Sequence, residues 1–377
     1  MQCPHFDAFR CPSCALMGVR YAAQLGDKAA DSRATLSSVV PEDAWAAPFP
    51  SVESGFRNKA KLVVGGAPGA VTLGILDERR RGVDLRDCGL YEPSLAEALT
   101  RLADWLDDLR LLPYDVARRR GELKYVHVTV SPDAELMVRF VLRSDRQAPR
   151  VRAGVGELRA ALPRLRVATI NLLPEHVALL EGDEEELLTE DATLPMDLGR
   201  LTLHLGPRAF FQTNTAVATG LYEQAREWIG DVAPESLVDL YCGVGGFGLY
   251  AATLAAPPSV LGIEVSQDAV ASARHTAKGL RDNGIATGAI EFRADDAGSA
   301  MPDAECVVVN PPRRGIDPTL SAALEAGGAD TLVYSSCNPG TLARDLAAMP
   351  SFTVRNARMF DMFPQTPHRE VLVLAVR

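Results

Sequence analysis

Cys337 stands where its thiol could do chemistry, in the stretch TLVYSSCNPGT at residues 331–341. The apolar run that opens the stretch predicts a buried strand, and the Asn-Pro-Gly after the cysteine predicts the turn that follows. A cysteine that only fills a core belongs inside the apolar run, whereas this one follows it. Because ligands bind at the carboxyl ends of parallel strands, the position favours a nucleophilic thiol over a buried, inert one.

A glycine-rich turn lies earlier in the chain, in LVDLYCGVGGFGLYAA. Gly243, Gly245 and Gly248 give the pattern G-x-G-x-x-G, in which glycines let the backbone turn tightly and approach a ligand. Glu264 closes the next predicted strand, where an acidic side chain can accept hydrogen bonds from both ribose hydroxyls. A dehydrogenase would show the same two features, so they predict a nucleotide-type ligand without choosing it.

Two further strand ends narrow the choice. Asp295 and Asp296 follow the run IEFRA, where they suit an adenine amine or a ribose, and Asn310 begins an Asn-Pro-Pro turn after VVV. Proline restricts the residue before it to extended backbone, which presents Asn310 at the edge of the sheet. The ordered set is similar to the S-adenosylmethionine (SAM) site of class I methyltransferases, in which such a turn meets a planar nitrogenous substrate.

A thiol beside a SAM site has a definite use on a uracil ring. C5 of uracil is too weak a nucleophile to attack a sulfonium methyl group, but a thiolate that adds at C6 produces an enolate with charge on C5. After C5 has accepted the methyl group, a base must remove the C5 proton so that the thiolate can leave. The segment PHREVLVLAVR offers Glu370 as that base, with His368 two residues earlier.

Three other classes stay open at this point. An NAD-dependent oxidoreductase would use the same glycine turn, but it would leave Cys337, Glu370 and the Asn-Pro-Pro turn without roles. A non-catalytic RNA-binding protein that retains a SAM fold would keep its biological effect after Cys337→Ala. An amino-methylating enzyme would use the Asn-Pro-Pro turn and needs no thiol.

A second group of cysteines lies near the N-terminus. Cys3, Cys11 and Cys14 have the spacing C-x7-C-x2-C, and Cys88 follows much later in RDCGLY. Four thiolates can close a tetrahedral zinc site or hold a [4Fe–4S] cluster, and spacing alone does not choose between them.

The elements that position these residues fall into three predicted domains: a cysteine-bearing segment at 1–50, an α+β domain at 51–205 and an α/β domain at 206–377. In the second, KYVHVTVS and ELMVRFVLR alternate like paired antiparallel strands, and SLAEALTRLADWLDDLRLL repeats leucine at helical spacing after a Ser94-x-x-Glu97 capping box. In the third, short apolar strands alternate with helical segments, which predicts a Rossmann-like, doubly wound parallel sheet.

Composition excludes some classes and leaves the partner open. The 377 residues are 47% hydrophobic and 23% charged, and no run approaches the ~18 apolar residues of a membrane span, so we expect a cytoplasmic protein with no membrane partner. A net charge of −10 argues against non-specific binding to nucleic acid. Residues 139–166 nevertheless carry eight arginines against Asp145 and Glu157, which suits an anionic partner and equally a solvated arginine-rich face.

Taken in order, the motifs FFQTN, DLYCGVGGFG, GIE, VNPPRRG, SSCNP and HREVLVL resemble the RNA uracil-5-methyltransferase family. They cover the C-terminal half, and FRNKAKL at residues 56–62 extends the match into the middle region. The resemblance implies a class I SAM-dependent methyltransferase domain with Cys337 as nucleophile and Glu370 as base. It implies SAM contacts by Gln212, Tyr241, Glu264 and Asn310, to which the strand-end and glycine patterns add Gly243, Gly245, Asp295 and Asp296.

The N-terminal half refines the resemblance. The cysteine segment looks the same as in the 23S rRNA branch of the family, which implies that Cys3, Cys11, Cys14 and Cys88 hold a [4Fe–4S] cluster, with zinc as the alternative. Because the chain begins directly at this segment, it resembles the shorter rRNA branch, for uracil 747. The implied reaction converts one uridine of 23S rRNA to 5-methyluridine, with another 23S uridine or a tRNA as alternatives.

The implied partner is 23S rRNA that presents an unpaired or flipped uridine, since a base inside a stem cannot reach the thiol. We expect no DNA partner and a monomer. Arg57 and Lys59 of FRNKAKL, with Arg313 and Arg314 of VNPPRRG, are the residues expected to contact phosphate.

Overall fold

The computed structural model describes residues 1–298 and 303–377, which form two compact units. One unit comprises Met1–Gly18 and Glu53–Met196, and the other comprises Val19–Val52 and Asp197–Arg377. No helix among the described residues is long and apolar enough to cross a membrane.

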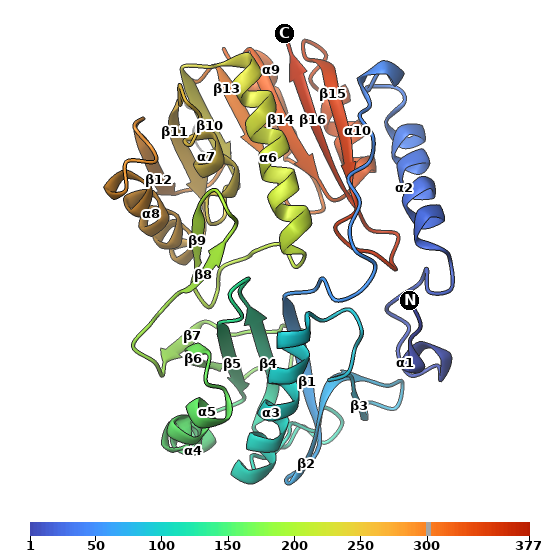
Figure 1. The fold of residues 1–377 in the computed structure, drawn as a ribbon, viewed down its shortest axis with the longest axis vertical. Coiled ribbons are helices and arrows are strands. Elements are labelled where there is room, and N and C mark those ends of the chain that lie inside the picture. The colour runs from blue at the N-terminus through green and yellow to red at the C-terminus, as the bar shows by residue number, and fades with distance from the viewer. Residues whose placement is uncertain (299–302) are drawn as a thin grey trace. The chain divides into compact units, whose positions relative to one another are not determined.

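The first unit contains a seven-stranded sheet in the order β3-β2-β1-β4-β5-β6-β7. Its strands are β1 (Lys59–Ala67), β2 (Ala70–Leu76), β3 (Gly82–Asp84), β4 (Leu123–Val130), β5 (Leu136–Leu142), β6 (Leu165–Leu172) and β7 (Glu184–Leu187). Its helices are α1 (Pro4–Asp7), α3 (Pro93–Leu109), η2 (Asp145–Gln147), α4 (Ala148–Ala153) and α5 (Val155–Ala161). The leucine face of α3 packs on one face of the sheet in a common apolar core, as predicted (Figure 1).

The predicted hairpin is confirmed, because β4 and β5 pair antiparallel across the turn at residues 131–135. The predicted capping box is wrong. Helix α3 begins at Pro93 with Glu92 as its N-cap and no side-chain cap, because proline suits the first helical position and moves Ser94 inside the helix.

The second unit contains a seven-stranded sheet in the order β12-β11-β10-β13-β14-β16-β15. Its strands are β10 (Ser236–Leu240), β11 (Ser259–Glu264), β12 (Ile290–Ala294), β13 (Cys306–Val309), β14 (Thr331–Ser336), β15 (Thr353–Phe360) and β16 (Glu370–Val376). The first five strands in this order are parallel, as predicted, whereas β16 runs antiparallel to both β14 and β15. A hairpin of β8 (Leu194–Asp197) and β9 (Thr202–Leu205) precedes the sheet along the chain.

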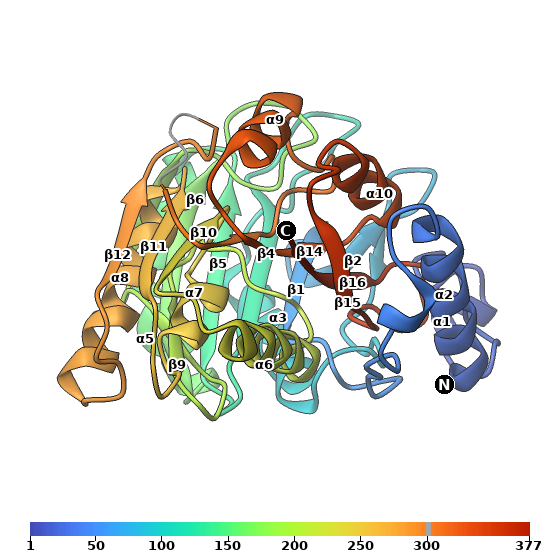
Figure 2. The same ribbon diagram turned by 90° about the horizontal axis from the view of Figure 1, so that it is seen from above.

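Helices cover both faces of this second sheet, which makes it doubly wound. In Figure 2, α6 (Thr215–Val232), α7 (Gly246–Ala251) and α8 (Gln267–Asp282) lie on one side, and α9 (Pro318–Ala326) and α10 (Pro339–Ala347) lie on the other. The 3-10 turn η1 (Glu42–Ala44) and the helix α2 (Tyr21–Leu36) belong to the same unit. Because β10 to β14 are parallel, their carboxyl ends lie at one edge of the sheet.

Helix α2 differs from its predicted place in the cysteine-bearing segment 1–50, because it packs beside α10 in the C-terminal unit. It is held there by a buried polar stripe one turn apart, Gln24, Lys28 and Ser32. Lys28 Nζ lies 2.6 Å from Asp361 Oδ1 and 3.0 Å from the carbonyl oxygen of Phe363. A polar stripe has no apolar periodicity, so this packing could not be predicted from the sequence.

The same stripe holds the segment between β15 and β16. Gln24 exchanges two hydrogen bonds with Gln365, whose backbone is in the left-handed region with φ 68°, and Ser32 accepts a hydrogen bond from Arg369 Nε at 2.8 Å. These contacts anchor the segment to α2, although it contains no helix or strand.

We expect Lys28→Ala to destabilise the protein by about 3–5 kcal/mol, because it leaves the buried Asp361 carboxylate without its partner. The control is Lys278→Ala, which removes an exposed ion pair with Asp282 and should change the free energy of unfolding by less than about 0.5 kcal/mol. Urea unfolding followed by tryptophan fluorescence measures both. Equal effects of the two substitutions would contradict the role given to Lys28.

Candidate active site

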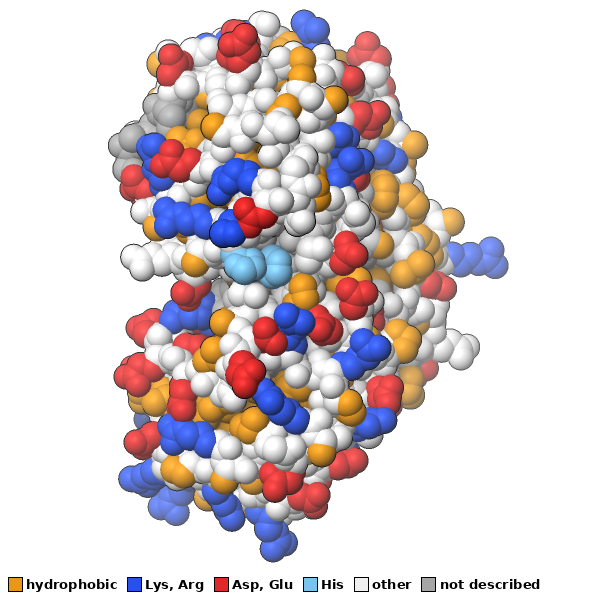
Figure 3. Space-filling model, turned by 60° about the vertical axis from the view of Figure 1, so that its left-hand side comes forward, with side chains coloured by type: hydrophobic (Ala, Val, Ile, Leu, Met, Phe, Trp, Pro, Cys, Tyr) orange, Lys and Arg blue, Asp and Glu red, His pale blue; other side chains and the backbone are white. Residues whose placement is uncertain are grey.

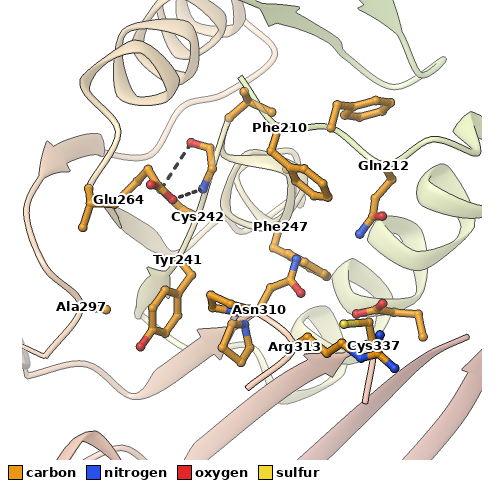
Figure 4. A pocket seen from close by; sticks show the side chains of 18 of the residues that line it. Phe210, Gln212, Tyr241, Cys242, Phe247, Glu264, Ala297, Asn310, Arg313 and Cys337 are labelled. Atoms are coloured by element: carbon orange, nitrogen blue, oxygen red, sulfur yellow. Dashed lines mark hydrogen bonds between the residues drawn. The ribbon is translucent and has the colours of Figure 1, made fainter. Parts of the chain in front are cut away.

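A cavity of about 660 Å³ opens at the carboxyl ends of β10, β11, β13 and β14. Figure 4 places Glu264 and Tyr241 toward one side and Cys337 with Arg313 toward the other, with Asn310 and Phe247 between them (Figure 4). The cavity has the size of a site for a drug-sized ligand. The residues that sequence patterns predicted at separate strand ends therefore surround one space.

The turn from β10 into α7 forms one wall. Gly245 has φ 85°, and a Cβ at this position would lie 2.8 Å from the ring of Phe292, so a side chain would be both strained and blocked. Asp239 is fully buried in β10, and its Oδ2 accepts a hydrogen bond from Gly248 N at 2.9 Å. Burial raises the pKa of this carboxyl to about 7. The turn is thus fixed by the strand beneath it.

Glu264 is the last residue of β11, and two backbone amides fix its carboxylate. Oε2 accepts from Gly243 N at 3.1 Å, and Oε1 accepts from Ser266 N at 2.9 Å. Because each carboxylate oxygen can accept more than one hydrogen bond, the group can still receive two hydroxyl donors from a ribose.

Eight of the predicted catalytic and cofactor-binding residues line the cavity: Gln212, Tyr241, Gly243, Glu264, Asp296, Asn310, Cys337 and Glu370. Gly245 and Asp295 are not among the lining residues. Gly245 is the N-cap residue of α7 and so shapes the turn behind the cavity wall. Asp295 Oδ1 accepts a hydrogen bond from Asp296 N at 2.8 Å.

Sequence reasoning missed the aromatic walls of the cavity, Phe210, Phe247 and Phe363. Phe210 is 68% exposed, which is unusual for a phenylalanine. Each lies within or near a quoted motif, but an aromatic residue there is read as core. Only the fold indicates which of them face a ligand.

Glu370 and Cys337 meet through the pairing of β14 with β16. The antiparallel register sets Ser336 opposite Val371, so β16 begins where β14 ends. Ser335 Oγ donates a hydrogen bond to Glu370 Oε1 at 2.7 Å, and both side chains are buried. Burial raises the pKa of Glu370 to about 7, and the Ser335 hydrogen bond opposes the rise. A carboxyl of this kind can both hold and release a proton near neutral pH.

The Cys337 thiol lies in the field of two charged groups. Burial raises its pKa, the Glu370 carboxylate raises it further, and the Arg313 guanidinium lowers it. The thiolate is therefore favoured when Glu370 is neutral and Arg313 stays close.

The four predicted cluster cysteines are free thiols, with Cys3 and Cys14 buried. Burial, followed by the charges of Cys88, Cys11 and Cys3, raises the pKa of Cys14 to about 11, so the four lie within electrostatic reach of one another. Among residues 1–298 and 303–377, no group of three or more His, Cys, Asp or Glu side chains is arranged to hold a metal ion. The predicted metal site thus stays a prediction.

Ion pairs neutralise half of the arginines in the stretch at 139–166. Four of its eight arginines pair with carboxylates, which are Arg139 with Glu181 and Glu185, Arg143 with Glu122, Arg152 with Glu186, and Arg166 with Glu135 and Asp191. On the face in Figure 3, basic and acidic side chains are interspersed (Figure 3). These pairs favour the solvated face over a single basic patch for this stretch.

The chain matches a family model described as tRNA (Uracil-5-)-methyltransferase over residues 186–377. A 23S rRNA (uracil(747)-C(5))-methyltransferase of Halothiobacillus neapolitanus is 46% identical, and that of Escherichia coli K12 is 41% identical, each over the whole length of both chains. The crystal structure of the Pyrococcus abyssi tRNA (uracil-54, C5)-methyltransferase in complex with S-adenosyl-L-homocysteine has the same fold. Its TM-score is 0.78 at 24% identity, covering 96% of this chain and 85% of that chain.

We expect the Glu370 carboxyl to ionise near pH 7, because burial penalises its charged form. The carboxyl band in the infrared difference spectrum between wild type and Glu370→Gln, recorded against pH, measures this. Ser335→Ala should move the midpoint to higher pH, since the lost hydrogen bond favours the carboxylate, whereas Ser335→Thr should retain it. A wild-type midpoint near pH 4.5 would contradict burial as the governing effect.

Proposed function

The chain belongs to the RNA uracil-5-methyltransferase family, and from this premise we propose that it methylates C5 of uracil 747 in 23S rRNA through a covalent adduct at Cys337. The proposal is carried by one observation: the Cys337 thiol and the buried Glu370 carboxyl, whose pKa is raised to about 7, lie at adjacent strand ends of the sheet. The position 747 rests on relatives of that description, which are 41–46% identical over the full chain.

In the proposed mechanism, the Cys337 thiolate adds to C6 of uracil, and the electron pair of the C5–C6 double bond moves toward O4 to give an enolate. SAM, when bound, supplies the electrophilic methyl group that C5 accepts. Glu370 then removes the C5 proton, and the returning electron pair expels the Cys337 thiolate and restores the double bond. Arg313 favours the thiolate at both ends of this sequence.

The residues of the cavity fit SAM. The Glu264 carboxylate, fixed by two amides, suits the ribose hydroxyls, and the glycine turn lets a ligand approach the backbone. Tyr241, Gln212 and Asp296 complete the set that we assign to SAM. Asn310 follows β13, the strand next to that of Cys337, where its amide can meet both the donor and the uracil ring.

We assign phosphate contacts in the first unit to one face of its sheet. Lys59 and Lys61 of β1 and His127 of β4 lie opposite the face that packs on α3, because alternate strand residues face opposite sides. Burial, then Lys61 and Arg139, lower the pKa of Lys59 to about 8, while Glu181 opposes the shift, so Lys59 and Lys61 are two cations close together on this face. Arg57, just before β1, is half-buried and donates to the Lys59 carbonyl oxygen, so it supports this face.

We further propose that Cys3, Cys11, Cys14 and Cys88 hold a [4Fe–4S] cluster, with zinc as the alternative. The support is the four-thiol donor set, to which thiolate-binding iron clusters and zinc both conform. Phe56, Leu90, Met1 and Met17 pack around Cys14 and Cys88 and would shield such a group from water.

We expect RNA that contains 5-fluorouridine at the target to form a stable covalent adduct with the wild-type protein and SAM, because fluorine at C5 cannot be removed as a proton. Cys337→Ala should give neither adduct nor 5-methyluridine, whereas Cys306→Ala, which removes a buried thiol elsewhere, should give both. Denaturing gels and nucleoside mass spectrometry are the measurements. Undiminished 5-methyluridine formation by Cys337→Ala would refute the mechanism.

Glu370→Gln should separate methyl transfer to C5 from the later removal of the C5 proton. Its turnover should fall by about 10²–10⁴-fold, as for the loss of a general base, while the methylated adduct accumulates on ordinary uridine RNA. Turnover at the wild-type rate would exclude Glu370 as the base.

Protein purified without oxygen should contain about four iron and four sulfide atoms per chain if the cluster assignment holds. Cys88→Ser should lose both, and Cys306→Ser should retain both. Metal and sulfide analysis that finds zinc and no iron would favour the alternative, and no metal would reject the site.

A further inference from the structure

A second cavity, of about 260 Å³, lies beside Cys337 in the C-terminal unit. Its walls are Asp31 and Thr35 of α2, Arg313, residues 337–340 where α10 begins, and residues 367–369 before β16. It shares Arg313, Cys337 and His368 with the main cavity. The nucleophilic sulfur therefore lies between two spaces, of which the mechanism above uses one.

The direction of the RNA chain indicates what the second space receives. A uracil whose C6 bonds to Cys337 occupies the main cavity together with SAM, which extends toward Glu264. The ribose-phosphate chain of that nucleotide must leave on the side away from SAM, and the second cavity adjoins the sulfur there. Because the strand continues in both directions from a flipped base, a neighbouring linkage must pass close to this point.

The charges of the cavity suit a phosphodiester. Arg313 is exposed and pairs with no carboxylate among the described residues, whereas Arg369 pairs with Asp31 and bonds to Ser32. Burial, then Arg313, Lys28 and Arg369, lower the pKa of His368, so its ring is neutral and can donate one hydrogen bond in a positive field.

The shape of the lining argues against a base. Among the residues that the structure describes, no phenylalanine, tyrosine or tryptophan lines this cavity, in contrast to Phe210, Phe247 and Phe363 of the main one. Single-stranded bases bind by stacking on flat side chains, which this cavity offers in His368 and Arg313 without a facing aromatic wall, whereas backbone is bound by charge and hydrogen bonds.

We propose that the second cavity binds the phosphodiester linkage next to the target uridine, with Arg313 and His368 as its donors and helix α2 as its outer wall. This inference rests on the proposed function, because it assumes that the main cavity receives a uracil. It makes α2 a positioning element for RNA as well as for the segment before β16.

Thr35 offers a test, because it lines the cavity, is exposed and takes no part in the chemistry. We compare Thr35→Gln, Thr35→Glu and Thr35→Lys for affinity to an RNA stem-loop with the 23S sequence around uracil 747. Glu should weaken binding about tenfold relative to its isostere Gln, and Lys should tighten it several-fold, since each acts on one phosphate charge. SAM affinity and the melting temperature should be the same in all three. Equal RNA affinities of the Gln and Glu variants would overturn the proposal.

A neutral methylphosphonate at the linkage 5′ or 3′ of the target uridine locates the contact. At the correct linkage it should weaken wild-type binding and abolish the difference between Thr35→Glu and Thr35→Gln. If that difference persists with either linkage neutral, the cavity does not bind a flanking phosphate. Wild-type protein that forms no 5-methyluridine on this RNA would reject the proposed function instead, so the two failures are distinct.

Discussion

The chemistry proposed for this protein depends on keeping one carboxyl, that of Glu370, out of water while leaving the thiol of Cys337 accessible beside it. Burial raises the pKa of Glu370 to about 7, and the strand that delivers this buried carboxyl to the cavity is β16. Strand β16 meets this need because it runs antiparallel between β14 and β15, so that its first residue lies where β14 ends. A wholly parallel sheet would place the start of that strand at the opposite edge.

The same burial opposes the nucleophile. It raises the pKa of Cys337, and an ionised Glu370 raises it further, so thiolate and carboxylate disfavour each other. The proposed mechanism needs the two charges at different times, the thiolate first and the carboxylate after methyl transfer. Arg313 lowers the pKa of Cys337 and so favours the thiolate, and the Ser335 hydrogen bond lowers the pKa of Glu370 and so favours the carboxylate. The proposed reactive pair therefore has a basic group beside its thiol and a hydrogen-bond donor beside its carboxyl.

Much of this site was predictable because its residues stand at strand ends, and strand ends are readable from apolar runs. Glu264, Asn310 and Cys337 each follow such a run, and a parallel sheet brings such ends to one edge. The aromatic residues that line the cavity, such as Phe247, were not predictable, because no local pattern distinguishes a ligand-facing ring from a core ring. The position of α2 was not predictable either. Helix α2 is fixed by single polar contacts to residues more than three hundred positions away.

Charge was the least predictable property, for a related reason. The eight arginines at 139–166 suggest a basic surface when counted along the sequence, yet half of them pair with carboxylates brought near by β7 and neighbouring loops. An anion is attracted most strongly by an unpaired cation in a concave site. In a paired guanidinium, the carboxylate offsets the positive charge and occupies N–H donors. Arg313 is in that position at the lip of both cavities, and a count of basic residues gives it no greater importance than any other arginine.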